Sequence, residues 1–112
     1  MRHAEYPHHV EFQQLSKVSD GGGGFTEMWT TVLDFNGLLD TPDSREVFQA
    51  QQLNVTLDRN FFYPYRTDVT EKMRAVYRYK DTVETYEIVS RPQDQGGQHE
   101  VMKLMLKLVP NG

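Results

Sequence analysis

Hydrophobic and polar residues alternate along much of the chain with a period of two, which is typical of β-strands. The clearest example lies near the C-terminus, where four apolar residues are predicted to point inward: Met102, Leu104, Leu106 and Leu108. Lys103 and Lys107 alternate with them and are expected to face solvent. This pattern predicts a strand with one buried face.

Residues 72–80 show the same alternation, with two faces of different character. The apolar face comprises Met73, Ala75, Tyr77 and Tyr79. The opposite face includes Val76 and four cations: Lys72, Arg74, Arg78 and Lys80. Successive side chains of a strand point to opposite sides, so this segment predicts a strand with one basic face.

Further strands are predicted at residues 8–18, 25–33, 34–39, 55–65 and 83–90, with turn-forming residues between them. Residues 21–24 are four glycines, which favour a flexible hairpin tip; no Lys-Ser/Thr follows them, as a phosphate-binding loop would require. The polar run 91–98 predicts a second hairpin loop. The predicted core is Val10, Phe12, Trp29, Leu33, Phe62, Met73, Ala75, Tyr77, Ile88, Leu104, Leu106 and Leu108.

Residues 41–54 carry the one convincing helix pattern. Asp43 or Ser44 can accept hydrogen bonds from the first free amides, and Glu46 stands where a capping box needs it. An apolar stripe is predicted from Val47, Ala50 and Leu53. Because isolated helices shorter than about 12–15 residues rarely hold in water, this helix needs support. It either packs over the open end of a barrel or orders against a partner.

Short strands with turns between them, and one helix, predict a mainly β protein. We favour a small antiparallel β-barrel over a sandwich, with one short helix inserted between strands and long flexible hairpin loops. The 112 residues suit a single domain at 8–109, with the helix-bearing insertion at 41–54. Residues 1–7 are predicted to form a loose leader.

Charge and composition narrow the function classes. The net charge of −4 argues against a general polyanion binder without excluding a local basic face. The chain has no cysteine, so disulfide and thiolate chemistry are absent. No apolar run approaches the ~20 residues of a membrane span, and the N-terminus has no apolar signal core, so we expect a soluble cytosolic protein.

Candidate chemistry is sparse, and we predict neither an enzyme nor a cofactor. No nucleophile elbow or metalloprotease motif is present, and no carboxylate pair is singled out. His3, His8 and His9 lie close in sequence, but His8 and His9 would face opposite sides of a strand. With His99 at a strand start, they favour solvated histidines over a metal site.

Binding is the better hypothesis, in two forms. Lys72, Arg74, Arg78 and Lys80 lie beside Tyr77 and Tyr79, the ingredients of a single-strand nucleic-acid platform, although the tyrosines fall on the opposite face. A solvated strand face explains these cations equally well. Alternatively, the acidic run 34–46, with four acidic residues and one arginine, and the basic run 72–80 suit head-to-tail association into a ring.

Several runs resemble the head–tail joining, or head completion, proteins of long-tailed phages. They lie at residues 44–53, 63–74, 76–77 and 86–89, in the family's order after a Gly-rich hairpin and Phe25-Thr-Glu-Met-Trp29. The resemblance covers roughly residues 8–109. The chain departs from the family's pattern at residues 34–43, and at 78–85, where the hairpin is longer than usual.

The resemblance implies a structural stopper protein that joins a ring, twelvefold in the family, below the portal and adaptor. Such a ring closes the DNA channel after packaging, holds DNA without reading its sequence and docks the tail completion protein. It implies a place in the virion neck, after assembly in the host bacterial cytoplasm. The expected subunit or channel interface is Asp40, Asp43, Ser44, Arg45, Glu46, Gln49 and Gln52.

Overall fold

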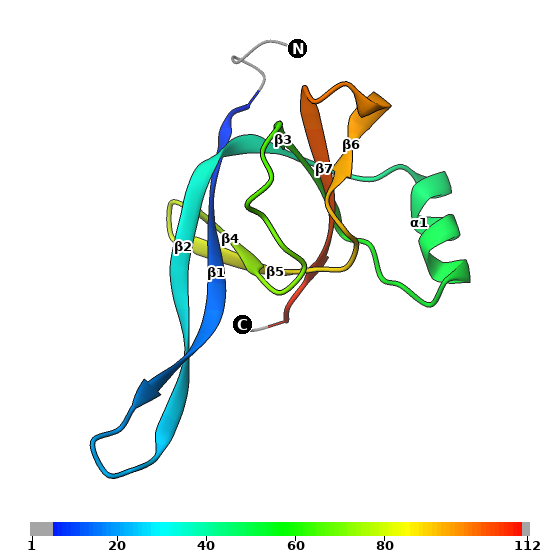
Figure 1. Ribbon diagram of the computed structural model, residues 1–112. Coiled ribbons are helices and arrows are strands. Elements are labelled where there is room, and N and C mark those ends of the chain that lie inside the picture. The colour runs from blue at the N-terminus through cyan, green and yellow to red at the C-terminus, as the bar shows by residue number, and fades with distance from the viewer. Residues whose placement is uncertain (1–5, 111–112) are drawn as a thin grey trace.

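The computed structural model describes residues 6–110, which form an antiparallel sheet with one helix at its side (Figure 1). The strands are β1 (His8–Ser19), β2 (Phe25–Asp40), β3 (Arg59–Pro64), β4 (Arg74–Tyr79), β5 (Thr82–Ile88), β6 (Gln93–Asp94) and β7 (Val101–Leu108). The helix α1 spans Ser44–Gln52, and a 3₁₀ turn follows β6 at Gln95–Gly97. The predicted mainly β class is confirmed.

Six strands close into a ring. The pairing order is β3-β2-β1-β4-β5-β7, and β7 pairs again with β3 from Arg59 opposite Leu106 to Pro64 opposite Val101. The short β6 adds to β7 on the edge that β5 leaves free. All these pairings are antiparallel, and side chains at alternate positions fill the interior of the ring.

The core lies inside this ring. Its fully buried large side chains are Val10, Phe12, Phe61, Tyr63, Tyr86, Leu104 and Leu106. Four aromatic rings form two stacked pairs in this core. The ring centroids of Phe12 and Phe35 are 4.9 Å apart, and those of Phe61 and Tyr63 are 5.5 Å apart. The predicted inward positions of β1 and most of those of β7 are thus confirmed.

The core prediction was wrong at several positions. Trp29 is 38% exposed because it lies on a hairpin beyond the ring, and Leu108 is 42% exposed at the last rung of β7. Phe62 is only half-buried, whereas its neighbours Phe61 and Tyr63 are fully buried. Because three consecutive residues are aromatic, the alternation of apolar and polar residues could not show which of them face inward.

Residues 25–40 form one long strand rather than the two that were predicted. A bulge opposite Phe12 and Gln13 shifts the register by one residue, and β2 continues through it to pair with β3. Gly37 permits this course, since a Cβ there would overlap the ring of Phe61 and the carbonyl of Phe62. Strand β3 begins at Arg59, four residues later than predicted.

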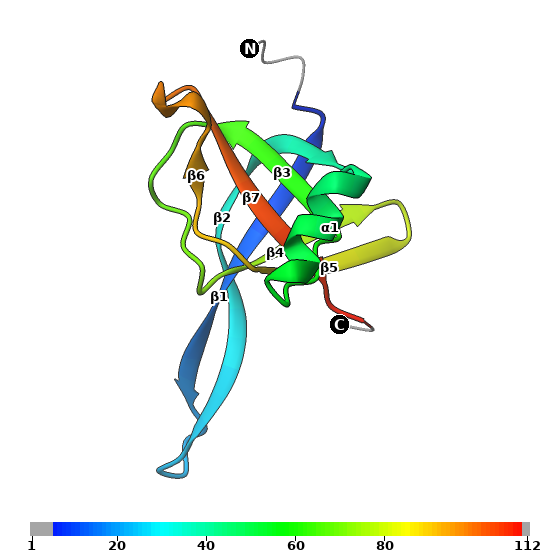
Figure 2. The same cartoon turned by 90° about the vertical axis from the view of Figure 1, so that its right-hand side faces the viewer.

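The first hairpin extends well beyond the ring (Figures 1 and 2). We call its outer part, residues 13–31, the arm. It pairs from Gln13 opposite Thr31 to Ser19 opposite Phe25. The principal extents of 50 × 32 × 31 Å reflect this elongation. Residues 21–24 form the tip as predicted, where the Asp20 carboxylate accepts hydrogen bonds from the amides of Gly22 and Gly24.

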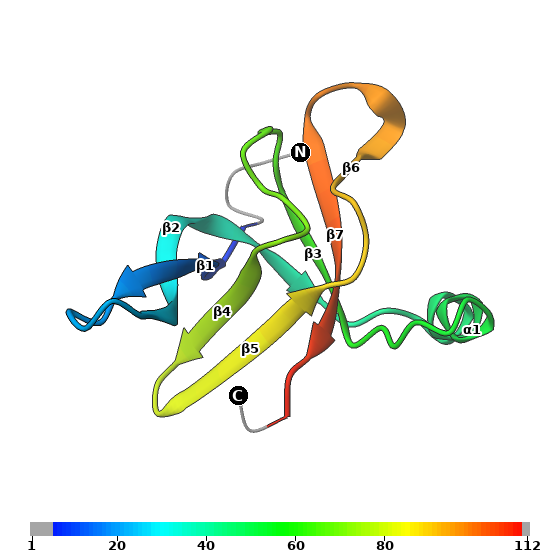
Figure 3. The ribbon, with the colours of Figure 1, turned by 60° about the horizontal axis from the view of Figure 1, so that its bottom comes forward.

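Helix α1 stands beside the ring rather than over its open end, as the three ribbon views show (Figures 1, 2 and 3). One of the two expectations for its packing was therefore wrong. Ala50 is buried, but Leu53 is 76% exposed, so the predicted apolar stripe is incomplete. Leu53 is the C-cap of the helix, and Asn54 adopts a left-handed φ of 59° that turns the chain back toward β3.

Candidate functional site

The N-terminus of α1 carries the predicted capping box. The Asp43 carboxylate accepts a hydrogen bond from the Glu46 amide at 2.8 Å, and the Glu46 carboxylate accepts one from the Asp43 amide at 3.3 Å. Two of the free amides at the helix start are thereby satisfied. The sequence pattern alone was enough to identify this start.

The Glu46 side chain also fastens the helix to the ring. Its second carboxylate oxygen accepts hydrogen bonds from Lys103 Nζ at 3.0 Å and from Asn60 Nδ2 at 3.1 Å. The hydrogen bond from Lys103 holds the pKa of the Glu46 carboxyl below its ordinary value, against the opposing effect of burial. Glu46, expected at an interface with a partner, is therefore engaged within its own chain.

Lys103 differs from the expected solvated outward lysine. Its side chain is only 18% exposed, since it reaches across to Glu46 and lies near the ring of Phe62. Strand alternation placed it correctly on the outer face of β7. The position of the helix beside that face could not be deduced from the alternation.

The remaining predicted interface residues lie at the end of β2 and on the insertion. Asp40, Ser44, Arg45, Gln49 and Gln52 are all exposed. Asp40 makes a local contact, accepting from the Thr41 amide at 2.9 Å. These side chains are exposed to solvent, so they can meet another molecule.

Two large apolar side chains accompany this polar surface. Phe48 is 59% exposed, and Leu53 is 76% exposed. An apolar side chain on a nine-residue helix would ordinarily pack against its own sheet, because that contact supplies most of a short helix's stability. The predicted apolar stripe did not include Phe48, and the sequence analysis did not identify it as part of a surface.

The basic residues of β4 do not form a row of free cations. Arg78 donates to the Glu11 carboxylate at 2.7 Å, which lowers the pKa of that carboxyl. Arg74 donates to the Gln13 side chain at 2.8 Å and stacks over the Trp29 ring at 4.2 Å. Burial lowers the pKa of the Arg74 guanidinium. Strand β1 therefore occupies the groups that would otherwise meet phosphates.

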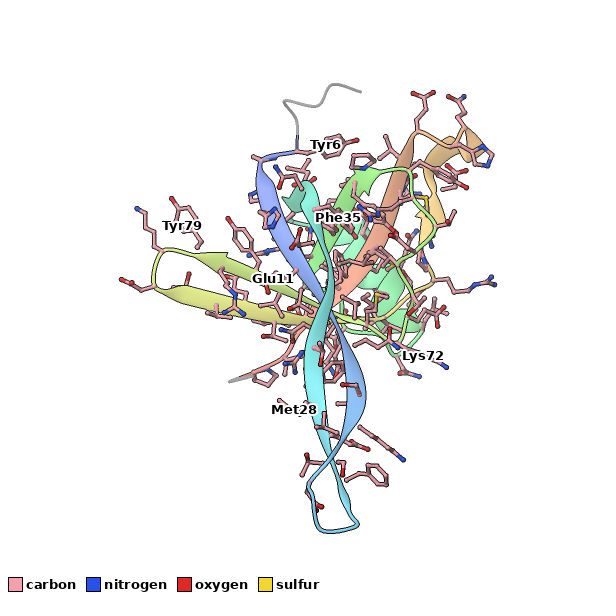
Figure 4. The ribbon with its side chains drawn as sticks, turned by 60° about the vertical axis from the view of Figure 1, so that its left-hand side comes forward. Tyr6, Glu11, Met28, Phe35, Lys72 and Tyr79 are labelled. Carbon is pink, nitrogen blue, oxygen red and sulfur yellow. The ribbon has the colours of Figure 1, made fainter. Side chains whose placement is uncertain are left out.

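Lys72 and Lys80 lie outside β4, at its two ends. Lys80 adopts φ 54° in the turn to β5, near the ring of Tyr79, while Lys72 lies in the turn before the strand. Figure 4 shows the labelled Lys72 and Tyr79 on opposite sides of the molecule. Tyr77 stacks on Tyr79, on the face opposite Arg74 and Arg78, so the two components of a nucleic-acid platform stay apart.

The arm is a second surface, and the sequence reading missed it. Beyond Gln13 its outer edges have no pairing partner among residues 6–110, because β1 pairs with β4 only from Val10 to Gln13 and β2 pairs with β3 only from Leu38 to Asp40. Large apolar side chains are exposed on both of its faces; Figure 4 shows Met28 well away from Phe35 in the ring. They are Leu15, Val18, Phe25, Met28 and Trp29.

Such a ribbon is marginal in water on its own, since two strands without a supporting layer bury little. Unpaired strand edges and clustered apolar side chains commonly mark sites where another chain binds. The signal available in the sequence was the apolar content of residues 25–33, which was read as core. We therefore regard the arm as an interaction surface.

One end of the ring is closed by the loop between β3 and β4. Arg66 forms a two-point ion pair with Asp68 at 2.7 Å and lies over the Phe35 ring at 4.1 Å. This pairing lowers the pKa of the Asp68 carboxyl and raises that of Arg66. Val69 and Met73 add buried apolar contacts, so this loop is structural.

The histidines of the described chain serve local contacts. His8 Nδ1 accepts from the Leu39 amide at 3.0 Å, and His9 contacts the Asn36 side chain at 2.7 Å on the other face. Within residues 6–110, no three histidine or acidic side chains gather closely enough to hold a metal ion. His3 lies outside the described residues. No helix in this part of the chain could cross a membrane.

Comparison with known proteins identifies the class. The family model described as phage head completion protein matches residues 1–109. The chain belongs to the phage head completion protein family. The resemblance found in the runs at 44–53 and 63–74 is thereby confirmed. The head completion family is a structural one, in agreement with the prediction that the chain is not an enzyme.

Individual relatives support the same assignment. Head completion protein gp16 of Bacillus phage SPP1 is 29% identical over 100 residues, which cover 89% of this chain and 88% of that protein. The solution structure of protein SF1141 from Shigella flexneri 2a superposes with a TM-score of 0.79 over the full length of both chains. At 14% identity, that likeness concerns the fold alone.

Membership of the family also changes how the two surfaces are interpreted. A head completion protein is a component of a larger particle, so exposed apolar side chains on the arm and on α1 are expected where neighbouring subunits or proteins bind. The acidic insertion and the arm are thus the two candidate assembly surfaces of this head completion protein.

Proposed function

We propose that this protein closes the filled phage head as a ring below the portal and adaptor, and offers the docking site for the tail completion protein. The helix-bearing insertion, residues 41–54, lies at a subunit contact or lines the DNA channel. The interface comprises Asp40, Asp43, Ser44, Arg45, Gln49 and Gln52, together with the anchoring Glu46. No bond is broken and no cofactor takes part.

The observation that carries this proposal, together with the family, is the way α1 is held. The helix stands beside the ring on two connecting segments and is fastened through one carboxylate, Glu46. A segment with few contacts to its own domain is easily reoriented when a partner supplies new ones. Ordering of the insertion on assembly would close the channel.

The charge of the insertion suits a wall that holds DNA without gripping it. Residues 40–52 contain Asp40, Asp43 and Glu46 but only one cation, Arg45. Acidic side chains repel phosphates, so packaged DNA would not adhere to the wall. The protein would act in the virion neck after assembly in the host cell.

Complementation of a phage lacking this protein tests the proposal. Reversing the wall charge with Asp40→Lys and Gln49→Lys should leave the fold intact, because exposed charges contribute little to stability. We avoid Asp43, since it caps the helix, and its loss would cost about 1 kcal/mol. Electron micrographs should show fewer intact filled heads than wild type; normal yields would count against the insertion's role.

The alternative, a nucleic-acid-binding β-barrel using residues 72–80, has less support from the geometry because Arg78 is paired with Glu11. It makes a distinct prediction. Binding to single-stranded DNA would weaken steeply with salt and would be lost in Arg74→Glu with Arg78→Glu, while heads stay normal. Salt titrations of DNA binding by the wild-type protein and by the double variant would decide between nucleic-acid binding and head completion.

A further inference from the structure

We propose that the arm of one copy docks against the α1 surface of the next copy in the ring. This inference rests on the proposed self-association and adds which parts of the chain meet. The arm surface consists of the exposed apolar side chains of the arm and of Lys72, a cation at the arm's root. The α1 surface consists of Phe48, Leu53, Asp40 and Asp43.

The two surfaces complement each other in apolar character. Phe25 is 68% and Met28 is 53% exposed on the arm, and Phe48 and Leu53 are more than half exposed on the insertion. Neither group is covered within residues 6–110. Burying exposed apolar area against a second copy would stabilise both elements, each of which is marginal alone.

Their placement favours contact between copies rather than within one. The ribbon views show α1 on one side of the ring and the root of the arm, with β4, on the other (Figures 1 and 3). The arm of a chain therefore cannot fold back onto its own helix. Two different patches on opposite sides of one subunit give a head-to-tail contact, which closes into a ring when the rotation permits.

The charges also correspond. Lys72 and Arg74 border a hollow of about 290 Å³ with Trp29. Among the described residues, neither cation has an acidic side chain within ion-pair distance, and Asp40 and Asp43 likewise have no cation within that distance. Arg74 is already bonded to Gln13 and Asp43 caps the helix, so Lys72 and Asp40 are the charges that remain to pair between copies and to orient one copy on the next.

Two other features of this region bear on the kind of partner. Glu71 and Glu87 also line the hollow; Glu71 lies 4.0 Å from the exposed Arg91, and Glu87 has no cation within ion-pair distance among the described residues. The arm itself carries Lys17, Asp20 and Glu27, so it has no excess of cations for DNA. The surface is therefore mainly apolar, with charges of both signs at its root, which suits a protein partner rather than DNA.

Engineered cysteines test the contact directly, because the chain has none of its own. Met28→Cys and Phe48→Cys are made in separate chains, mixed, and allowed to assemble on filled heads that lack this protein. A short thiol-to-thiol crosslinker should then give dimers that contain one chain of each variant. The matched control replaces Met28→Cys with Val83→Cys, at a similarly exposed position on the β4–β5 hairpin.

Ring assembly is scored first, by electron microscopy of the heads. Rings with mixed dimers above the Val83→Cys control support the inference. Rings whose arm–helix dimers do not exceed that control overturn it and leave the proposed function standing. If the wild-type protein forms no ring on these heads, the proposed function fails, and this inference fails with it.

A second measurement exchanges the charges of Lys72 and Asp40 and needs no cysteine. Lys72→Glu or Asp40→Lys alone should reduce the number of heads that carry a ring, and the two changes together should restore it. Equal defects in the single and double variants would show that these charges do not meet, which contradicts the docking.

Discussion

The closed ring and the parts that project from it are stabilised in different ways. Inside the ring, Phe61, Tyr63 and Leu104 are fully buried and contact several strands at once. The arm relies on its own strand pairing, and α1 relies on a capping box and one anchoring carboxylate. One sequence thus carries both a self-sufficient core and elements that depend on few contacts.

The difference indicates where each function of the chain lies. The ring supplies a rigid scaffold, because tightly packed interiors resist deformation. The projecting elements supply surfaces, because weakly held segments can adapt to a partner at small cost. Perturbations of the ring should therefore affect stability strongly, and perturbations of the projections should affect assembly far more than stability.

The largest effect is expected in the core of the ring. Leu104→Ala should lower the free energy of unfolding by about 2–5 kcal/mol, since it empties a fully buried position in β7. Leu108→Ala, on the same strand but 42% exposed, is the matched control and should cost much less. Urea denaturation measures the free energy of unfolding of both variants. Equal losses would show that Leu108 contributes to the core as much as Leu104 does.

A smaller effect is expected at the anchor of α1. Glu46→Gln removes the charge that Lys103 contacts, and should lower the free energy of unfolding by roughly 1 kcal/mol, because the Glu46 side chain is about one-third exposed. Amides of residues 44–53 should exchange faster than in wild type, while those of β7 stay protected. Glu27→Gln, on the exposed arm, is the control.

The structure also revises an expectation for Lys103. An outward lysine on β7 would tolerate alanine silently, but Lys103→Ala should loosen α1 much as Glu46→Gln does, because both remove the same ion pair. Hydrogen exchange of the free protein checks this. Slow exchange throughout residues 44–53 in the wild-type monomer would contradict the view that the insertion orders on assembly.

Acid should release the helix. The pKa of the folded Glu46 carboxyl lies below the ordinary value of 4.5, so its contribution is fully present above that value and is lost as the pH falls through the lower folded pKa. Amide chemical shifts of residues 44–52, followed by NMR against pH, should report the change. In Lys103→Met, the midpoint of this change should move to higher pH. An unmoved midpoint would show that Lys103 does not lower the pKa of Glu46.

The smallest effect on stability is expected on the arm. Phe25→Ser with Met28→Ser should change the free energy of unfolding by only about 0.5 kcal/mol, because both side chains are exposed. The same variant should complement a deficient phage poorly. Thermal denaturation and plaque counts together test this, and full complementation would exclude the arm as an assembly surface.

Local features of this protein could be predicted from the sequence because they depend on neighbouring residues. The alternation around Ala75 and around Leu104 identified β4 and β7, since strand geometry fixes the side of each residue. The spacing of Asp43 and Glu46 identified the start of α1 for a similar reason. The family resemblance followed from ordered runs of residues in the same way.

Other features were decided only by the tertiary structure. The pairing of β3 with β7 closes the ring across about 40 residues, and no local pattern specifies it. The same closure leaves Trp29 outside and buries Phe61, although both are aromatic residues in strand-like runs. It also brings Lys103 to Glu46, 57 positions apart, and so attaches the helix. Burial and long-range pairing depend on which faces of the strands and helix contact one another. The pattern of residues along the chain predicts which faces are apolar, but not which of them come into contact.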